Sequence, residues 1–187
     1  MLPLGSPAPP FKLPDTDGRD VSIHDFDGRR ALLVMFICNH CPYVQHIRGK
    51  LAEVTAALMA RSVGVVGINS NDPARYPDDA PARMAEERRK IGYRFPYLFD
   101  ESQEVAKAYR AACTPDLFLF DARRRLAYRG QFDGSRPGTK EPVTGADLLA
   151  AAEAVLASRR PAHDQKPSVG CNIKWRPGNE PAYFGST

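Results

Sequence analysis

The sequence has no apolar run that approaches the roughly 18 residues needed to span a bilayer. Its N-terminus, MLPLGSPAPPFKLPD, lacks both the basic region and the apolar stretch of about 7 to 15 residues that a secretory signal requires. Internal repeats are absent as well. We therefore expect a soluble, cytoplasmic protein with no membrane partner.

An excess of charge of one sign is also lacking. The 26 Lys and Arg residues exceed the 22 Asp and Glu residues by only four, so nucleic-acid partners are not expected. Hydrophobic residues make up 43% and charged residues 26%, which is typical of a folded globular protein, and 187 residues suit one domain. We assign residues 1–159 to that domain. Residues 160–187, rich in Pro, Gly and Asn, are expected to form a tail that packs on it, partly through Trp175.

Cysteine is scarce too, and four residues in a chain of this length argue against a fold held together by disulfides. Two of them, Cys38 and Cys41, lie three apart in the stretch FICNHCPYV. Cys-x-x-Cys is half of many tetrahedral zinc sites, but Cys113 and Cys171 stand alone, and no second Cys-x-x-Cys or His-x-x-x-His pair is present. We therefore expect no metal and no other cofactor, and favour redox chemistry of the pair.

Hydrophobic periodicity predicts an α/β fold with a mixed central sheet flanked by helices. The continuous apolar runs Ala31–Ile37 and Val63–Ile68 are typical of strands buried on both faces. After Pro42, apolar residues recur at steps of three and four and predict a helix, since proline is tolerated in a first helical turn. The later elements are expected in this order: a helix at 83–91, a short strand in FPYLFD, a helix at 102–109, a hairpin of DLFLF and LAYRG, and a helix capped by Thr144 with Asp147.

The cysteine pair is thus placed where a buried strand ends and a long helix begins. The positive end of the helix dipole and free backbone N–H groups stabilise a thiolate, and we expect Cys38 to be the exposed sulfur with a lowered pKa. Cys41, one turn further in, is expected to be more buried and less ionised. His40 is expected to favour the thiolate form, its alternative role being that of an exposed turn residue.

The chain resembles the thioredoxin superfamily, in particular its redoxin branch of AhpC/TSA-like (peroxiredoxin-like) proteins and thioredoxin-like thiol-disulfide oxidoreductases. Four segments carry the resemblance: FKLPDTDGRDVSIHDFDGRRALLVMF, CNHCPYV, CTPDLFLFD and the tail PSVGCNIKWRPGNEP. It implies a thioredoxin-like fold with an N-terminal hairpin extension, and activity as a thiol-disulfide oxidoreductase. In that activity Cys38 is the nucleophile and Cys41 the resolving thiol.

The same resemblance implies that Pro115 is a cis-proline facing the sulfurs. A cis bond would turn the backbone so that Thr114 pairs with an incoming extended peptide, whereas the alternative is a plain turn into a strand. Asn39 and Pro42 are the other expected substrate-binding residues, with protein or small-molecule disulfides and thiols, and an electron donor, as partners. Cys113 is expected to pack as a small hydrophobic residue.

Two departures from the family pattern keep alternatives open. Peroxiredoxins carry a threonine where this chain has Cys38, a departure that weighs against peroxidase chemistry at Cys41. A peroxiredoxin-like thiol peroxidase is kept as an alternative. Thioredoxins bury an acidic residue in the strand before the motif, but Ala31–Ile37 contains none, so the proton of Cys41 must move through water, His40 or an unidentified group. A redox-sensing or binding module without turnover is the other alternative. Cys171 becomes a third exchange partner if the tail folds over the motif.

Overall fold

The computed structural model describes residues 2–184, which fold around a five-stranded mixed sheet. Its strands, in the order in which they lie side by side, are β5 (Tyr97–Phe99), β4 (Val63–Asn69), β3 (Ala31–Phe36), β7 (Asp116–Phe120) and β8 (Leu126–Gly130). Strands β5, β4 and β3 are parallel, whereas β7 runs antiparallel to β3 and forms a hairpin with β8. This topology confirms the predicted α/β fold with a mixed sheet.

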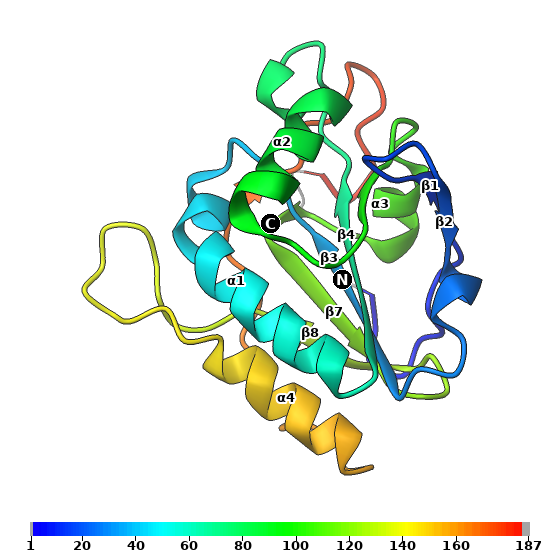
Figure 1. Ribbon diagram of the computed structural model, residues 1–187, viewed down its shortest axis with the longest axis vertical. Coiled ribbons are helices and arrows are strands. Elements are labelled where there is room, and N and C mark those ends of the chain that lie inside the picture. The colour runs from blue at the N-terminus through cyan, green and yellow to red at the C-terminus, as the bar shows by residue number, and fades with distance from the viewer. Residues whose placement is uncertain (1, 185–187) are drawn as a thin grey trace.

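The helices lie on both faces of this sheet (Figure 1). They are α1 (Pro42–Ala60), α2 (Pro81–Ile91), α3 (Glu104–Tyr109) and α4 (Ala146–Leu156), with short 3₁₀ turns at η1 (Ile23–Phe26) and η2 (Pro77–Asp79). Among the described residues, no helix is both long and apolar enough to cross a membrane. The helices predicted after Pro42, at 83–91 and at 102–109 are all present, within two residues of the expected starts.

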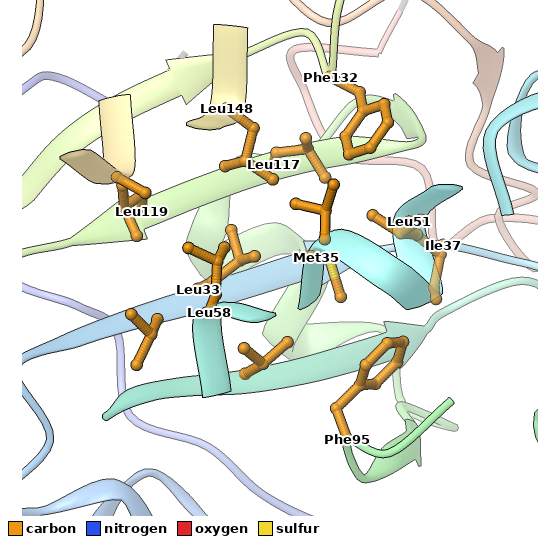
Figure 2. Packing of buried hydrophobic residues seen from close by; sticks show 14 of the residues in the cluster. Leu33, Met35, Ile37, Leu51, Leu58, Phe95, Leu117, Leu119, Phe132 and Leu148 are labelled. Carbon is orange, nitrogen blue, oxygen red and sulfur yellow. The ribbon is translucent and has the colours of Figure 1, made fainter. Parts of the chain in front are cut away.

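The central strand β3 separates two hydrophobic cores. Successive side chains of a strand point to opposite faces. Leu33 and Met35 therefore pack with α1 and α4, as Figure 2 shows, whereas Leu32 and Val34 pack with α3 and the N-terminal segment. All four side chains have 0% exposure, and burying each one contributes about 1.5–3 kcal/mol. This two-sided burial fixes the end of β3, and with it the start of the cysteine turn.

The start of α1 follows from its first two residues. Pro42 occupies the first helical turn, where its missing N–H would lack an intrahelical partner anyway, and Cys41 is the N-cap. The buried face of the helix holds the apolar residues whose spacing predicted it: Val44, Ile47, Leu51, Val54 and Leu58. Packing of that face on β3 and β4 therefore places the first backbone N–H groups of α1 beside the cysteines.

Two short pairings attach the ends of the chain to the body. Strands β1 (Lys12–Pro14) and β2 (Asp20–Ser22) form the expected N-terminal hairpin. In the tail, β9 (Cys171–Asn172) pairs antiparallel with β6 (Cys113–Thr114), directly before β7. Trp175 is 5% exposed and lies in the second core, so this part of the tail packs on the body.

The predicted capping box of the last helix is wrong. The residue before α4 is Gly145, whose backbone is left-handed (φ 70°). Asp147 accepts a hydrogen bond from Gln131 at 2.5 Å and does not cap the helix. The backbone N–H groups of Thr144 and Gly145 instead donate to Asp133, both at 2.7 Å. Asp133, in the loop after β8, therefore binds the backbone before α4, where the Thr-x-x-Asp pattern predicted a capping box.

Candidate active site

The sulfurs of Cys38 and Cys41 meet at Thr114. Cys38 Sγ lies 3.2 Å from the Thr114 hydroxyl, and Cys41 Sγ lies 3.1 Å from the Thr114 carbonyl oxygen. A hydrogen bond also links the two cysteine side chains, and both are free thiols. The Thr114–Pro115 peptide bond is cis, as predicted, so the residue before the cis-proline is the one that contacts both sulfurs.

Cys41 is the more acidic thiol of the pair. Its pKa is lowered to about 4, and the largest cause is the hydrogen bond from Cys38. Backbone hydrogen bonds from Val44 and Cys171 lower it further, as does the Thr114 side chain, against desolvation, which raises it. Val44 lies in the first turn of α1, where backbone N–H groups have no intrahelical partner and stabilise an anion.

The expectation that Cys38 is exposed and acidic is wrong. Cys38 is 2% exposed, Cys41 is 0% exposed, and the pKa of Cys38 is raised well above its ordinary value. The hydrogen bond to Cys41 is the largest cause, followed by desolvation and by the negative charge of Asp79. Position adds to this cause, because Cys41, and not Cys38, is the N-cap residue of α1, although its side chain makes no cap hydrogen bond.

A buried carboxylate, Asp79, organises the turn between the cysteines. Asp79 has 0% exposure and accepts a hydrogen bond from the backbone N–H of Asn39 at 2.7 Å and another from Asn71 at 2.8 Å. Its second oxygen lies 2.5 Å from Nδ1 of His40, whose ring stacks on Tyr76. His40 is therefore not a free turn residue, because it is fixed between an acidic and an aromatic partner.

Sequence reasoning missed Asp79, which lies 41 positions after Cys38. Asp78 and Asp79 are adjacent in a polar loop, and nothing in the sequence distinguishes them. In the structure Asp78 is exposed and Asp79 is buried, because η2 turns the second carboxylate inward. The acidic group that β3 lacks is thus supplied by a loop, on the Cys38 side of the pair.

The other predicted substrate-binding residues serve the turn itself. The Asn39 side chain donates to the backbone of Asp78 at 2.7 Å and accepts from Tyr97 at 3.1 Å, so its polar atoms are already used. Pro42 is exposed at the start of α1. A contact of either residue with substrate stays a prediction.

The remaining two cysteines differ in their relation to the pair. Cys113 is buried, and desolvation raises its pKa far above the ordinary value, as expected for a packed hydrophobic residue. Cys171 lies opposite Thr114 in the β6–β9 pairing, and its side chain forms a hydrogen bond with Cys41. Desolvation and that hydrogen bond raise the pKa of Cys171 to about 11. The tail therefore does fold over the motif.

Two side chains of the turn, together with Asp79, are of the types that bind metal ions. Among the described residues, Cys38, His40 and Asp79 bring one ligand atom each within 4.8 Å of one another. Zinc bonds of about 2.0–2.2 Å in tetrahedral geometry would hold the nitrogen and oxygen about 3.3 Å apart. The 2.5 Å between His40 and Asp79 is instead a hydrogen-bond distance. As they lie, His40 and Asp79 bond to each other, whereas Cys38 contacts Thr114.

Comparison with known proteins places this geometry in a family. Residues 4–129 match the AhpC/TSA family. The chain belongs to that family. A putative peroxiredoxin from Mycobacterium tuberculosis is 33% identical over 114 residues, which are 59% of this chain and 65% of that protein. The thiol-disulfide oxidoreductase ResA from Geobacillus thermodenitrificans is 26% identical over 123 residues, 66% of each. This AhpC/TSA chain thus spans a little under two thirds of the length of the mycobacterial relative.

Solved structures agree on the fold of this AhpC/TSA protein. A hypothetical protein from Sinorhizobium meliloti is 49% identical, covers 95% of this chain and 97% of its own, and superposes with a TM-score of 0.94. The thioredoxin domain of a thiol-disulfide oxidoreductase from Bacteroides vulgatus covers 80% of this chain and 97% of its own, with a TM-score of 0.61 at 16% identity. The fold is therefore thioredoxin-like, as the sequence resemblance implied.

Proposed function

We propose that the protein is a thiol-disulfide oxidoreductase that uses Cys38 and Cys41 as a redox-active pair. The observation that carries this proposal is the convergence of both sulfurs on Thr114, 3.2 and 3.1 Å from its hydroxyl and carbonyl oxygens, directly before a cis-proline. An acidic thiol beside a less acidic one is the combination needed to attack a disulfide and then resolve the mixed disulfide. Two relatives of the chain, a putative peroxiredoxin and a thiol-disulfide oxidoreductase, support thiol redox chemistry.

We infer from the lowered pKa of Cys41 that the two cysteines take the reverse of the expected roles. The Cys41 thiolate attacks the substrate disulfide, which gives a mixed disulfide and releases one substrate thiolate. Cys38 then loses its proton and attacks Cys41 Sγ, which releases the second substrate thiolate and leaves a Cys38–Cys41 disulfide. The hydrogen bond to Cys41, desolvation and the charge of Asp79 all raise the pKa of Cys38, so this thiol is the protonated member of the reduced pair.

The partners that suit this chemistry are protein or small-molecule disulfides and thiols. A thiol electron donor must return the Cys38–Cys41 disulfide to the reduced state, and a reducing compartment such as the cytoplasm would supply one. Thr114, Asn39 and Pro42 are the proposed substrate-binding residues, and Pro115 and His40 support the pair.

Turnover of a model disulfide with dithiothreitol as reductant tests the proposal. We expect the wild type to reduce many equivalents and Cys41→Ser to reduce none. The double variant Cys38→Ser, Cys171→Ser should stop after one equivalent, held as a mixed disulfide on Cys41. Cys113→Ser is the matched control and should retain the wild-type rate, because Cys113 takes no part in either step. A wild type that reacts once per chain and then stops is a redox sensor and not an oxidoreductase.

Thiol peroxidase activity is a second candidate, which the low pKa of Cys41 favours. In that reaction the Cys41 thiolate attacks a hydroperoxide, becomes a sulfenic acid, and condenses with Cys38 to a disulfide with loss of water. Burial of both sulfurs suits so small a substrate. Thiol-dependent consumption of hydroperoxide by the wild type, faster than its reduction of disulfides, would favour this candidate.

A further inference from the structure

Burial of Cys38 and Cys41 limits the access of substrates to their sulfurs, and the tail carries a more exposed cysteine beside them. Cys38 and Cys41 are 2% and 0% exposed, so a thiol or disulfide reaches either sulfur only after the surrounding segments open locally. Cys171, on β9, is only partly buried. Of the three linked sulfurs, Cys171 is therefore the one that solvent reaches.

The tail occupies the place at which an extended peptide would pair beside the sulfurs. Cys171 lies directly opposite Thr114 in an antiparallel pairing. Thr114 is the residue before the cis-proline. The approach is close: a Cβ added to Gly170 would lie 2.0 Å from the Thr114 carbonyl oxygen, so only glycine fits there. A strand added at this edge is the arrangement by which many proteins bind a peptide through its backbone.

The contacts of Cys171 lead to Cys41. The Cys171 side chain and the Cys171 backbone both hydrogen bond to the Cys41 sulfur. Cys113, on the paired strand, instead contacts the Pro115 carbonyl oxygen at 3.6 Å. Cys41 thus has a sulfur neighbour on each side, Cys38 within the motif and Cys171 from the tail.

Anchors on both sides of Cys171 hold the tail in place. Before it, Ser168 donates to the carbonyl oxygen of Gly130 at 2.8 Å. After it, the carbonyl oxygen of Lys174 accepts from the backbone N–H of Asp72, also at 2.8 Å. Cys171 is therefore positioned by the fold, and its sulfur does not have to be brought to Cys41 by a large motion.

We propose that Cys171 is a third redox-active residue, which exchanges with the Cys38–Cys41 disulfide and presents it to external thiols as a Cys41–Cys171 disulfide. This inference rests on the proposed function, which supplies the oxidised pair. Cys171 loses its proton to solvent and attacks Cys41 Sγ; the Cys38–Cys41 bond breaks, and Cys38 leaves as a thiolate that takes up a proton. One disulfide is replaced by another, so the exchange needs no added oxidant or reductant.

Peptide mapping of the full-length protein distinguishes the two disulfides. Trypsin leaves Cys38 and Cys41 together in residues 31–48, Cys113 in 111–123 and Cys171 in 160–174, because the bonds before Pro161 and Pro167 resist cleavage. A Cys38–Cys41 disulfide therefore stays within one peptide, whereas Cys41–Cys171 joins two. Acid quenching stops exchange by protonating the thiolates.

We expect Cys38→Ser, oxidised with diamide, to give the peptide 31–48 joined to 160–174 as its main product. In oxidised wild type, about 10% or more of the protein should carry this cross-link in equilibrium with the Cys38–Cys41 disulfide. The double variant Cys38→Ser, Cys171→Ser should give neither product. A wild type and a Cys38→Ser variant that both lack the cross-link would overturn the inference.

A kinetic measurement separates failure of the inference from failure of the proposed function. Cys171→Ser should still form the Cys38–Cys41 disulfide, but glutathione should reduce it about tenfold more slowly than the wild type, since the exposed sulfur is gone. Equal rates would show that Cys171 has only a structural role and leave the proposed function standing. Failure of Cys171→Ser and wild type alike to form the Cys38–Cys41 disulfide would remove the proposed function itself.

Discussion

The two sides of the cysteine pair have opposite electrostatic surroundings. On the Cys41 side lie donors: the backbone N–H of Val44 in the first turn of α1, the backbone of Cys171 and the side chain of Thr114. On the Cys38 side lies the buried anion Asp79. Two identical side chains three residues apart therefore receive pKa shifts of opposite sign, which arise first from the hydrogen bond between them and then from their different neighbours.

The groups around the two cysteines also differ in how firmly the body of the protein holds them. The carboxylate of Asp79 is fixed by three partners within the body of the protein. Part of the donor set around Cys41 comes from the tail, through a two-residue pairing at Thr114. Displacement of the tail would therefore change the pKa of Cys41 more than that of Cys38.

The largest effect is expected from removal of the anion with Asp79→Ala. This substitution leaves the buried N–H groups of Asn39, His40 and Asn71 without their acceptor, and should lower the free energy of unfolding by about 3 kcal/mol. Urea denaturation measures the loss. Asp78→Ala is the matched control, since its side chain is exposed, and should change stability by less than about 0.5 kcal/mol. Similar losses for both variants would contradict the role given to Asp79.

The pattern of the sequence was enough to predict the frame of the site. Strand β3 and helix α1 follow from an apolar run and a period of three to four, and their junction places the cysteines correctly. The identity of the acidic thiol did not follow, because Cys38 and Cys41 both lie within reach of a predicted helix start. Their pKa shifts depend on the hydrogen bond between them and on contacts from distant segments.

The contacts that distant segments make at the site could not be predicted from the hydrophobic pattern of the sequence. Asp79 and Asp78 have the same local sequence signal, and only the turn η2 buries one of them. The pairing of Cys171 with Thr114 joins residues 57 positions apart through two residue pairs, too short a strand for alternation to indicate.

A smaller effect is expected from Gly170→Ala, which should loosen the pairing of β9 with β6 on the Cys41 side of the pair. The added Cβ would lie 2.0 Å from the Thr114 carbonyl oxygen, and backbone atoms cannot move aside as a flexible side chain does. We expect β9 to leave β6 and the reduced pair to react with iodoacetamide about tenfold faster, because local opening then costs less. Gly49→Ala adds its Cβ in open space on α1 and serves as the control. Unchanged alkylation in Gly170→Ala would mean that the tail does not cover the sulfurs.

The last effect, no larger in free energy than that of Gly170→Ala, concerns the hydrogen bond inside the pair. Cys38→Ala removes the largest contribution to the lowered pKa of Cys41, so this pKa should rise from about 4 by about one unit, or 1.4 kcal/mol. The ultraviolet absorbance of the thiolate, followed against pH in reduced protein, reports it. The pKa values of Cys113 and Cys171 are both raised, so the transition at low pH belongs to Cys41. Cys113→Ala is the control and should leave that transition in place.

The sign of the associated stability change follows from the direction of the shift. The folded pKa of Cys41 is below its ordinary value of 9.0, so ionisation of this thiol stabilises the fold above pH 9 in full, and the contribution is lost as the pH falls through about 4. In Cys38→Ala the folded pKa is higher, so the same contribution should be smaller and should disappear at a higher pH. A low-pH transition that does not move in Cys38→Ala would mean that the helix N-terminus alone, without its neighbouring thiol, sets the acidity of Cys41.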